Sequence, residues 1–347
     1  MNNNSASCKY IPTDIQKEGL SLIYGENISC IFEGKENVVA VNHVDFSIEE
    51  NKITAIIGES GSGKSTLLKL IYGVLEPNTG EVRYRGWLVP TRKDKLIPGH
   101  DAMKLVSQGF DDLNLYAKVW DNIASQLSNT DLENKKNKTQ AILEKLRIDH
   151  LAQHRVVDLS GGEKQRVAIS RALINEPEVL LMDEPFNQVD AAFRDSLQHD
   201  IRHIVEETGL TVVLVSHDPA EVLGMADALI VMRNGKIVDQ GIPKDLYYSP
   251  NDPYTALLLA KSNILPPSQA PIFGLETDIT VAVHQEWIDI TADPSGKFWI
   301  KEIRFRGFYS EYLIGNDNIS IRALAKQSIP LSKDTKVNVS LSNYITF

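Results

Sequence analysis

The chain has 347 residues, of which 42% are hydrophobic and 24% are charged, and its formal net charge is −10. This composition is that of a folded globular protein, which excludes a disordered tail or a fibre, and the length suggests one large and one small domain. The acidic balance disfavours DNA or RNA as the main partner, because proteins that bind nucleic acids usually present a net basic face.

The N-terminal residues are polar and lack the apolar core of a secretory signal peptide. No apolar run approaches the roughly 18 residues of a membrane-spanning helix, so we expect that the chain does not cross a membrane by itself. The two cysteines, Cys8 and Cys30, have no metal-ligand spacing, and this favours a reduced cytosol. Residues 1–26 are expected to form an N-terminal extension, in which residues 20–24 are either an additional strand or a short packing arm.

From residue 27 onward the pattern predicts two or three strands up to residue 58, with turns at residues 33–35 and 50–52. Residues 53–57 read as a buried strand and residues 64–72 as an amphipathic helix. Helical periodicity follows from about residue 110 to 175. Two apolar strands at 179–182 and 211–215 enclose a helix at about 191–207. Such alternation of strands and helices predicts an α/β fold with a parallel sheet covered on both faces.

The last third of the chain changes character. Asn234 and Gly235 stand between two apolar runs and predict a β-hairpin. Residues 263–271 are rich in proline and predict a linker. Short alternating runs in residues 272–347 predict a small all-β module, a barrel of the OB-like kind.

A glycine-rich run lies between the strand at 53–57 and the helix at 64–72, and it fits the pattern G-x-x-x-x-G-K-[ST]. Its residues are Gly58, Glu59, Ser60, Gly61, Ser62, Gly63, Lys64, Ser65 and Thr66. Glycines let several backbone N–H groups point at one anion, and the helix dipole adds positive charge at the same place. Lys64 would reach the β- and γ-phosphates of a nucleotide and Ser65 would ligate Mg²⁺. The alternative is a chance glycine-rich turn, which the flanking strand and helix disfavour.

Two carboxylates and a histidine follow the apolar strands. Asp183 and Glu184 come at the end of one strand, where open α/β sheets bind ligands. Asp183 is a candidate Mg²⁺ ligand, and Glu184 is a candidate base for an attacking water. His217 follows the next strand and is a candidate contact to the γ-phosphate or that water, although a lone histidine in such a place is usually structural. His199 and His203, spaced i, i+4 on a polar helix face, make a weak alternative metal site.

A second run predicts a prepared helix N-terminus: Ser160, Gly161, Gly162 and Glu163. Ser160 is a good N-cap, and a capped helix is the simplest interpretation. Two consecutive glycines at a helix start cost backbone entropy, however, and would be useful where an anion approaches the backbone.

In this order and spacing, the motifs resemble those of the ATP-binding subunits of ABC transporters, over residues 27–262 with a helical subdomain at about 110–165. The resemblance implies three further site residues: Phe32 stacking on adenine, Gln108 binding nucleotide and Mg²⁺, and Asp190 in the D-loop. It also implies that Ser160, Gly161, Gly162 and Glu163, the signature run, close over the ATP held by a second copy. Glu184 and His217 would then be catalytic.

The partners implied are a second copy or a similar ATPase, separate transmembrane permease subunits and, indirectly, an extracytoplasmic solute-binding protein. The expected location is the cytoplasmic face of the cell membrane. Phe110, Leu113, Tyr116 and Trp120 are candidates either for the surface that docks the permease or for ordinary core.

The C-terminal module resembles the TOBE-like β domains of importer ATPases for sugars, polyamines, ferric iron or oxyanions, and this favours uptake over export. A soluble ABC-type ATPase of repair or translation stays as an alternative. Such proteins usually carry a coiled-coil insertion, tandem ATPase halves or basic arms, and none is visible here. The β module could also bind a regulator.

Overall fold

The computed structural model describes residues 21–347 apart from 36, 97, 111 and 327–330, so most of the predicted N-terminal extension and Cys8 lie outside the described residues. The chain divides into two compact units, residues 1–237 and residues 238–347. Within the described part of the chain, no helix is both long and apolar enough to cross a membrane.

The first unit is built on the predicted parallel sheet, whose parallel strands have the order β9-β3-β8-β7-β6, and the hairpin strand β10 extends this sheet beside β9. Its strands are β3 (Ile53–Ile57), β6 (Met103–Val106), β7 (Val179–Asp183), β8 (Thr211–Ser216), β9 (Ala228–Arg233) and β10 (Lys236–Gly241). Every residue of β3, β7 and β8 is buried, as expected for central strands that are covered on both faces. The predicted hairpin is confirmed, because Asn234 and Gly235 have φ of 49° and 76° between β9 and β10.

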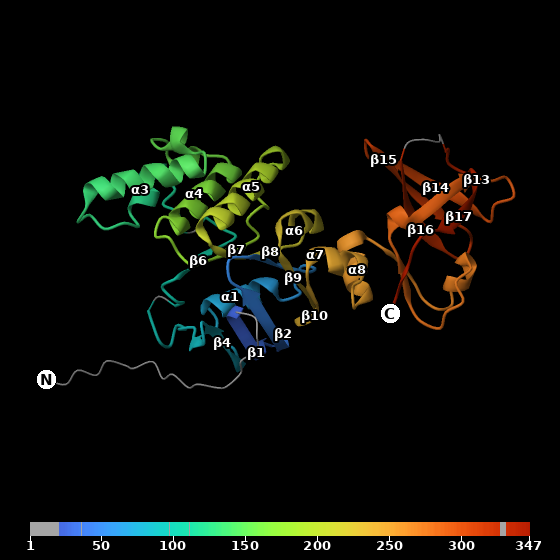
Figure 1. The fold of residues 1–347 in the computed structure, drawn as a ribbon, viewed down its shortest axis with the longest axis horizontal. Coiled ribbons are helices and arrows are strands. Elements are labelled where there is room, and N and C mark those ends of the chain that lie inside the picture. Colours follow the sequence, from blue (N-terminus) through green and yellow to red (C-terminus); the bar gives the residue numbers. More distant parts are fainter. Residues whose placement is uncertain (1–20, 36, 97, 111, 327–330) are drawn as a thin grey trace. The chain divides into compact units, whose positions relative to one another are not determined.

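A second, antiparallel sheet has the order β2-β1-β4-β5. Its strands are β1 (Ser21–Phe32), β2 (Val38–Glu49), β4 (Thr79–Tyr84) and β5 (Trp87–Leu88), so residues 21–24 form the start of a strand. Helix α1 (Lys64–Tyr72) lies between this sheet and the parallel sheet (Figure 1). One core cluster joins the three layers, with Ile23 and Val44 from the antiparallel sheet, Leu67 from α1, and Ile56 and Val213 from the parallel sheet.

The helical part of the first unit contains α2 (Val119–Ala124), α3 (Leu132–Lys145) and α4 (Gly161–Leu173), with 3₁₀ turns at Asp149–Leu151 and Val156–Asp158 between α3 and α4. Helices α5 (Ala191–Thr208) and α6 (Pro219–Met225) follow β7 and β8. Figure 1 shows α3 and α4 side by side, away from the antiparallel sheet. The region predicted as helical is thus helical, but it is divided by turns.

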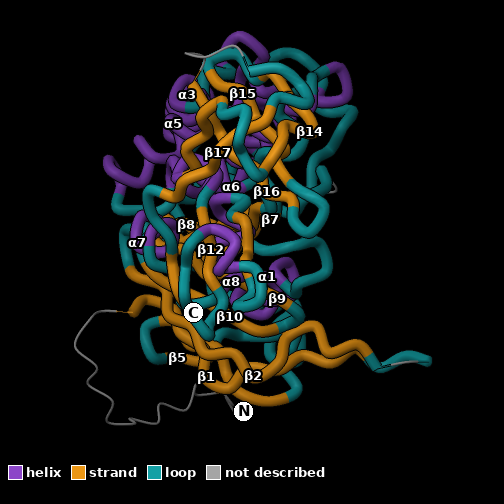
Figure 2. The backbone as a smooth tube through the Cα atoms, turned by 90° about the vertical axis from the view of Figure 1, so that its right-hand side faces the viewer, coloured by secondary structure: helices purple, strands orange, loops and turns teal. Residues whose placement is uncertain are grey.

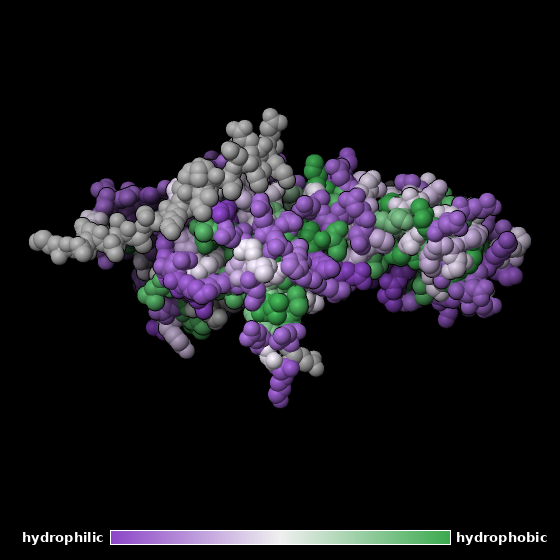
Figure 3. All heavy atoms as spheres, turned by 90° about the horizontal axis from the view of Figure 1, so that it is seen from below, coloured by the Kyte–Doolittle hydropathy of each residue, from purple (hydrophilic) through white to green (hydrophobic). Residues whose placement is uncertain are grey.

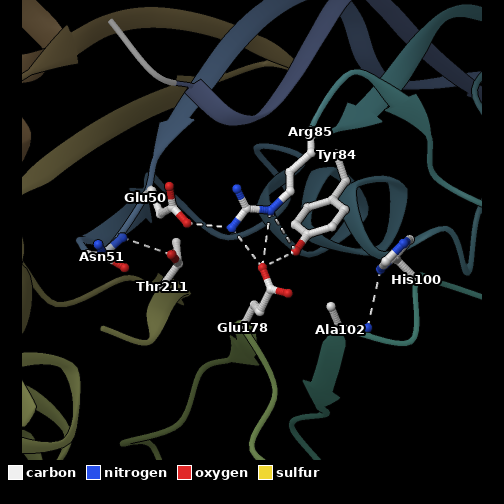
Figure 4. A network of polar contacts seen from close by, with 8 residues as sticks. All are labelled: Glu50, Asn51, Tyr84, Arg85, His100, Ala102, Glu178 and Thr211. Atoms are coloured by element: carbon white, nitrogen blue, oxygen red, sulfur yellow. Dashed lines mark hydrogen bonds and ion pairs between the residues drawn. The ribbon is translucent and has the colours of Figure 1, made fainter. Parts of the chain in front are cut away.

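A polar network ties β4 to the start of β7 (Figure 4). Tyr84 Oη donates to Glu178 Oε2 at 2.5 Å, and Arg85 Nη2 donates to Glu178 Oε2 at 2.8 Å and to Glu50 Oε1 at 2.5 Å. Since these residues come from both sheets of the first unit, the network fixes the antiparallel sheet to the parallel one.

The second unit is mainly β-structure, as predicted, but it also contains two helices, α7 (Pro243–Tyr248) and α8 (Pro253–Ala260). A three-stranded sheet has the order β11-β12-β18 and a five-stranded sheet the order β13-β17-β14-β15-β16. The strands are β11 (Asn263–Leu265), β12 (Val281–Val283), β13 (Ile288–Ala292), β14 (Phe298–Phe305), β15 (Tyr309–Gly315), β16 (Ser320–Lys326), β17 (Lys336–Leu341) and β18 (Ile345–Thr346). The outer strands β13 and β16 pack against each other, so the five-stranded sheet curls toward a barrel.

His284 attaches the two helices to the β-strands of the second unit. Its side chain is fully buried, and its Nε2 lies 2.8 Å from Tyr247 O while its Nδ1 lies 2.7 Å from Ser262 Oγ. The ring of Trp287 stacks on it at 3.9 Å between centroids. The second compact unit spans residues 238–347, and the segment expected to be a linker contains β11.

Candidate nucleotide-binding site

The glycine-rich loop connects β3 to α1, and Gly63 is the N-cap of α1 with φ of 102°. A Cβ atom at Gly63 would lie 2.1 Å from Ala40 O, so any other residue would both strain the backbone and push the β2 strand away. The loop is therefore shaped by a close contact between its backbone and the antiparallel sheet. In this loop Glu59, Ser60 and Gly61 are exposed and Thr66 is half-buried.

Lys64 is buried under its own loop. Its Nζ donates to Gly58 O at 2.9 Å and to Glu59 O at 2.8 Å. Burial lowers the pKa of the Lys64 ammonium, while the carboxylates of Glu184 and Asp183 act in the opposite direction. An ammonium has three N–H donors, and these carbonyls use two of them.

The hydroxyl of Ser62, in the same loop, is buried and unpaired. Its Oγ is buried and has no hydrogen-bond partner, although the Ser62 backbone O accepts from Gly235 N at 3.0 Å. Buried polar atoms are nearly always paired, so an unpaired hydroxyl in a glycine-rich loop indicates a ligand atom. A polyphosphate, whose oxygens all accept hydrogen bonds, fits this set of donors.

Ser65 and Asp183 meet at the other side of the loop. Ser65 Oγ donates to Asp183 Oδ1 at 2.7 Å, and Asp183 is the buried last residue of β7. A hydroxyl and a carboxylate are ligands that Mg²⁺ accepts, together with phosphate oxygens and water. The described residues contain no group of three histidine, cysteine, aspartate or glutamate side chains suited to a metal.

Three side chains meet at the Glu184 carboxylate. Gln108 Nε2 donates to its Oε2 at 2.9 Å, Asn187 Nδ2 donates to the same oxygen, and His217 Nδ1 lies 3.6 Å from its Oε1. Its backbone has φ of 50°, a left-handed conformation that costs a non-glycine residue roughly 1–2 kcal/mol. The structure thus brings Gln108, Glu184 and His217 together, and the sequence had placed only Glu184 and His217 at one edge of the sheet. Asn187 was not predicted, although it lies in the D-loop segment (residues 187–190).

The signature run forms a capping box at the start of α4. Ser160 Oγ accepts from Glu163 N at 3.3 Å, and Glu163 Oε2 accepts from Ser160 N at 2.8 Å. The backbone N–H of Ser160, more than its hydroxyl, lowers the pKa of the Glu163 carboxyl. Ser160 and Glu163 therefore cap the start of α4, as in the simpler of the two interpretations of the signature run.

Gly161 has a steric reason to be glycine. A Cβ atom there would lie 2.4 Å from Gln188 O in the D-loop segment, whereas one at Gly162 would meet only Val189 Cγ1 at 3.4 Å. The close approach at Gly161 is therefore to another part of the same chain. Asp190 ends this segment as the N-cap residue of α5.

Phe32 lies exposed at the end of β1, where β1 and β2 form a projecting hairpin (Figure 2). Three further apolar side chains share this exposed surface: Ile31, Val38 and Val39. Figure 3 shows the hydrophobic surface at the base of the projection. The predicted aromatic contact is thus part of a wider apolar patch.

The candidates for a docking surface separate into core and surface residues. Leu113 is buried, Phe110 and Trp120 are half-buried, and Tyr116 is 78% exposed. In the weak alternative metal site, His203 Nε2 lies 2.9 Å from Glu207 Oε1.

Comparison with known proteins identifies the family. Residues 41–187 match the family model described as ABC transporter. The glucose import ATP-binding protein GlcV of Saccharolobus solfataricus is 36% identical over 244 residues, which are 69% of this chain and 68% of that protein.

Solved structures agree with this. The cbiO1 protein of Clostridium perfringens, described as part of the ABC transporter complex cbiONQ, matches with a TM-score of 0.59 and 27% identity over 65% of this chain and 90% of cbiO1. The dimeric structure of MJ0796, described as a bacterial ABC transporter cassette, matches with a TM-score of 0.57 and 27% identity over 64% of this chain and 98% of MJ0796. The chain belongs to the ABC transporter family of ATP-binding proteins, and it is an ATPase with the fold of that family.

Proposed function

We propose that this protein is the energy-coupling ATPase of an importer. Two copies, or one copy and a similar ATPase, bind ATP head to tail, and the dimer drives separate transmembrane permease subunits at the cytoplasmic face of the membrane. The solute is small and of the sugar, polyamine, ferric iron or oxyanion class. The likeness to a glucose import protein supports the direction of transport, and the dimeric relative supports the assembly.

In this proposal the glycine-rich loop binds the triphosphate. Lys64 and the backbone N–H groups hold the β- and γ-phosphates, and Ser65, Gln108 and Asp183 hold Mg²⁺, which would offset phosphate charge and orient the γ-phosphate when bound. Phe32 stacks on the adenine. The buried orphan hydroxyl of Ser62 supports this assignment.

Glu184 orients and deprotonates the attacking water, and His217 contacts the γ-phosphate or that water. The single observation that carries the hydrolytic role is the convergence on the Glu184 carboxylate of Gln108, at 2.9 Å, and His217, at 3.6 Å. The left-handed backbone at Glu184 supports a functional constraint, because strained residues cluster at active sites.

The site is incomplete in one molecule, and the signature run of the second molecule completes it. Ser160, Gly161 and Gly162 close over the ATP, Glu163 caps the helix behind them, and Asp190 lies at the interface between the copies. ATP then joins the two copies, and hydrolysis lets them separate.

Replacing Glu184 by glutamine tests the proposal. Glu184→Gln keeps the shape of the side chain and removes the base, so ATP binding is retained while turnover falls by about 100-fold or more. With saturating ATP and Mg²⁺, the variant accumulates as a dimer, measured by light scattering coupled to size exclusion.

The second variant, Ser160→Arg, supplies the control for the shared site. It binds ATP as a monomer, and in the Glu184→Gln background it prevents the dimer. Wild-type turnover of Glu184→Gln, or an unchanged ATP-dependent dimer of the doubly substituted chain, contradicts the proposal.

A further inference from the structure

His217 is the central residue of a turn that is closed by the hydroxyl of its neighbour. Ser216, the buried last residue of β8, accepts at its Oγ from Asp218 N at 3.0 Å and donates from the same Oγ to Glu221 Oε2 at 2.5 Å. Serine hydroxyls often fix turns in this way, by bonding to a backbone N–H two residues on. One hydroxyl therefore ties together the residues on both sides of His217.

A buried carboxylate holds that hydroxyl in place. The side chain of Glu221 is only 6% exposed, and Arg194 Nη1 lies 3.3 Å from its Oε1. Burial raises the pKa of the Glu221 carboxyl, and the Ser216 hydroxyl and the Arg194 guanidinium act in the opposite direction. A carboxylate out of water needs such a partner, because an unpaired buried charge is strongly destabilising.

Arg194 also reaches the other end of the turn. Its Nη1 lies 3.6 Å from Asp218 Oδ2, and Asp218 Oδ1 accepts from Ala220 N at 2.9 Å at the start of α6. Arg194 is in the first turn of α5, where its backbone N donates to Asp190 O at 3.1 Å. The guanidinium thus connects the beginning of α5 with both acidic residues that follow His217.

We infer that Ser216, Glu221 and Arg194 are positioning residues that hold the His217 imidazole toward Glu184. The inference rests on the proposed role of His217 in hydrolysis. The His217 side chain is 51% exposed, so its orientation depends on the backbone of the turn more than on packing around the ring. A merely structural cluster would stabilise the fold without acting through His217.

The test compares ATP hydrolysis by the full-length variants Ser216→Ala, His217→Ala and the double variant. Ser216→Ala is expected to lower kcat by about tenfold or more while the Kd for ATP changes by less than about twofold. In the double variant the loss equals that of His217→Ala alone, because a positioning residue has no effect once the residue it positions is gone.

Two further variants keep the test independent of folding. Ser216→Thr retains the hydroxyl, so its kcat is expected to lie within about threefold of wild type. Glu221→Gln retains an acceptor for Ser216 but loses the charge that pairs with Arg194, so it lowers kcat by less than Ser216→Ala does. Ser170→Ala is the matched control: it removes a buried hydroxyl that donates to Arg166 O at 2.8 Å within α4, and it leaves kcat unchanged.

The inference is overturned if the losses in kcat of the two single variants add up in the double variant. It is also overturned if Ser216→Ala has the kcat of wild type while His217→Ala has a lowered kcat. If His217→Ala has the kcat of wild type, the proposed role of His217 in hydrolysis is wrong, and the inference that rests on it is wrong as well. If Ser216→Ala does not fold, a kcat of Glu221→Gln equal to wild type is the overturning result.

Discussion

Lys64 is held by its own loop. Its ammonium bonds to the carbonyls of Gly58 and Glu59, and burial lowers its pKa. A phosphate nearby would favour the charged form, so nucleotide binding and protonation of Lys64 support each other.

Replacing Lys64 by alanine should therefore weaken ATP binding strongly. Charge-assisted hydrogen bonds contribute about 1.5–3 kcal/mol each, which corresponds to about 10- to 100-fold in Kd. Lys69→Ala, a half-buried lysine in the last turn of the same helix, serves as the control and leaves the Kd unchanged in a titration calorimeter. Equal Kd values for Lys64→Ala and wild type would contradict the assignment of the loop.

Local sequence predicted most of the site residues that the structure brings together. Lys64, Ser65 and Asp183 follow from a loop pattern and a strand end, because parallel strands and their helices direct such residues to one edge. The contact of Asn187 with Glu184 could not be predicted, since it depends on the left-handed backbone at Glu184. The close approach of Gly161 to Gln188 is likewise a tertiary contact between segments that are far apart in the sequence.

At the scale of elements, α4 begins against the D-loop segment, and Gly161 is the point of contact. Gly161→Ala places a methyl group 2.4 Å from Gln188 O, so the backbone of one segment must move. The expected loss in the free energy of unfolding is about 1–3 kcal/mol, measured by urea denaturation.

The neighbouring glycine is the matched control for that measurement. At Gly162 the added methyl group meets only ordinary van der Waals contacts, the nearest at 3.4 Å, so Gly162→Ala does not lower the unfolding midpoint. Equal midpoints for both variants would show that the contact at Gly161 is not tight in solution.

The network around Glu178 gives the contact between the two sheets a dependence on pH. Hydrogen bonds from Tyr84 and then from Arg85 lower the pKa of the Glu178 carboxyl from its ordinary value of 4.5. The stabilisation is complete above that ordinary value, and it is lost as the pH falls through the lowered pKa of the folded state. The Glu178 side chain is 51% exposed, so solvent screens the interaction and the effect is small.

Accordingly, Glu178→Gln should lower the free energy of unfolding by about 0.5 kcal/mol at pH 7, and the difference from wild type should be smaller at pH 3. Denaturant titrations at the two pH values measure this. Glu206→Gln, at an exposed position on α5, is the control and differs from wild type at neither pH. If the difference between Glu178→Gln and wild type grew toward acid pH, the network would not stabilise the ionised Glu178 carboxylate, and the prediction would be wrong.

At the scale of the whole molecule, the second compact unit includes α7 and α8. Because His284 bonds to Tyr247 and Ser262, a fragment that starts after these residues leaves the buried imidazole without its partners. We expect a fragment of residues 242–347 to be more stable than one of residues 272–347 by about 2 kcal/mol, at about 1 kcal/mol for each buried hydrogen bond. Circular dichroism melts of the two fragments measure the difference, and equal melting temperatures would place the boundary near residue 262 after all.

Those strands and helices that produce a clear local periodicity of apolar residues could be predicted from the sequence. Apolar runs gave the parallel strands, and alternation in residues 272–347 gave the β module. Strand β11 was not predictable, because Asn263–Leu265 lies directly before the proline-rich run and pairs with β12, which is distant in the sequence. The 3₁₀ turns between α3 and α4 were also missed, since helical periodicity does not reveal short interruptions.

The contact between Gly161 and the D-loop segment has a consequence for how two molecules would work together. Asn187 of that segment donates to the Glu184 carboxylate, so the segment that Gly161 contacts also touches the proposed catalytic base. In the dimer that we propose, closure of the signature run over the neighbour's ATP would therefore be felt through this segment at Glu184 of the same chain. Hydrolysis at the two sites would thereby be coupled through contacts within each chain.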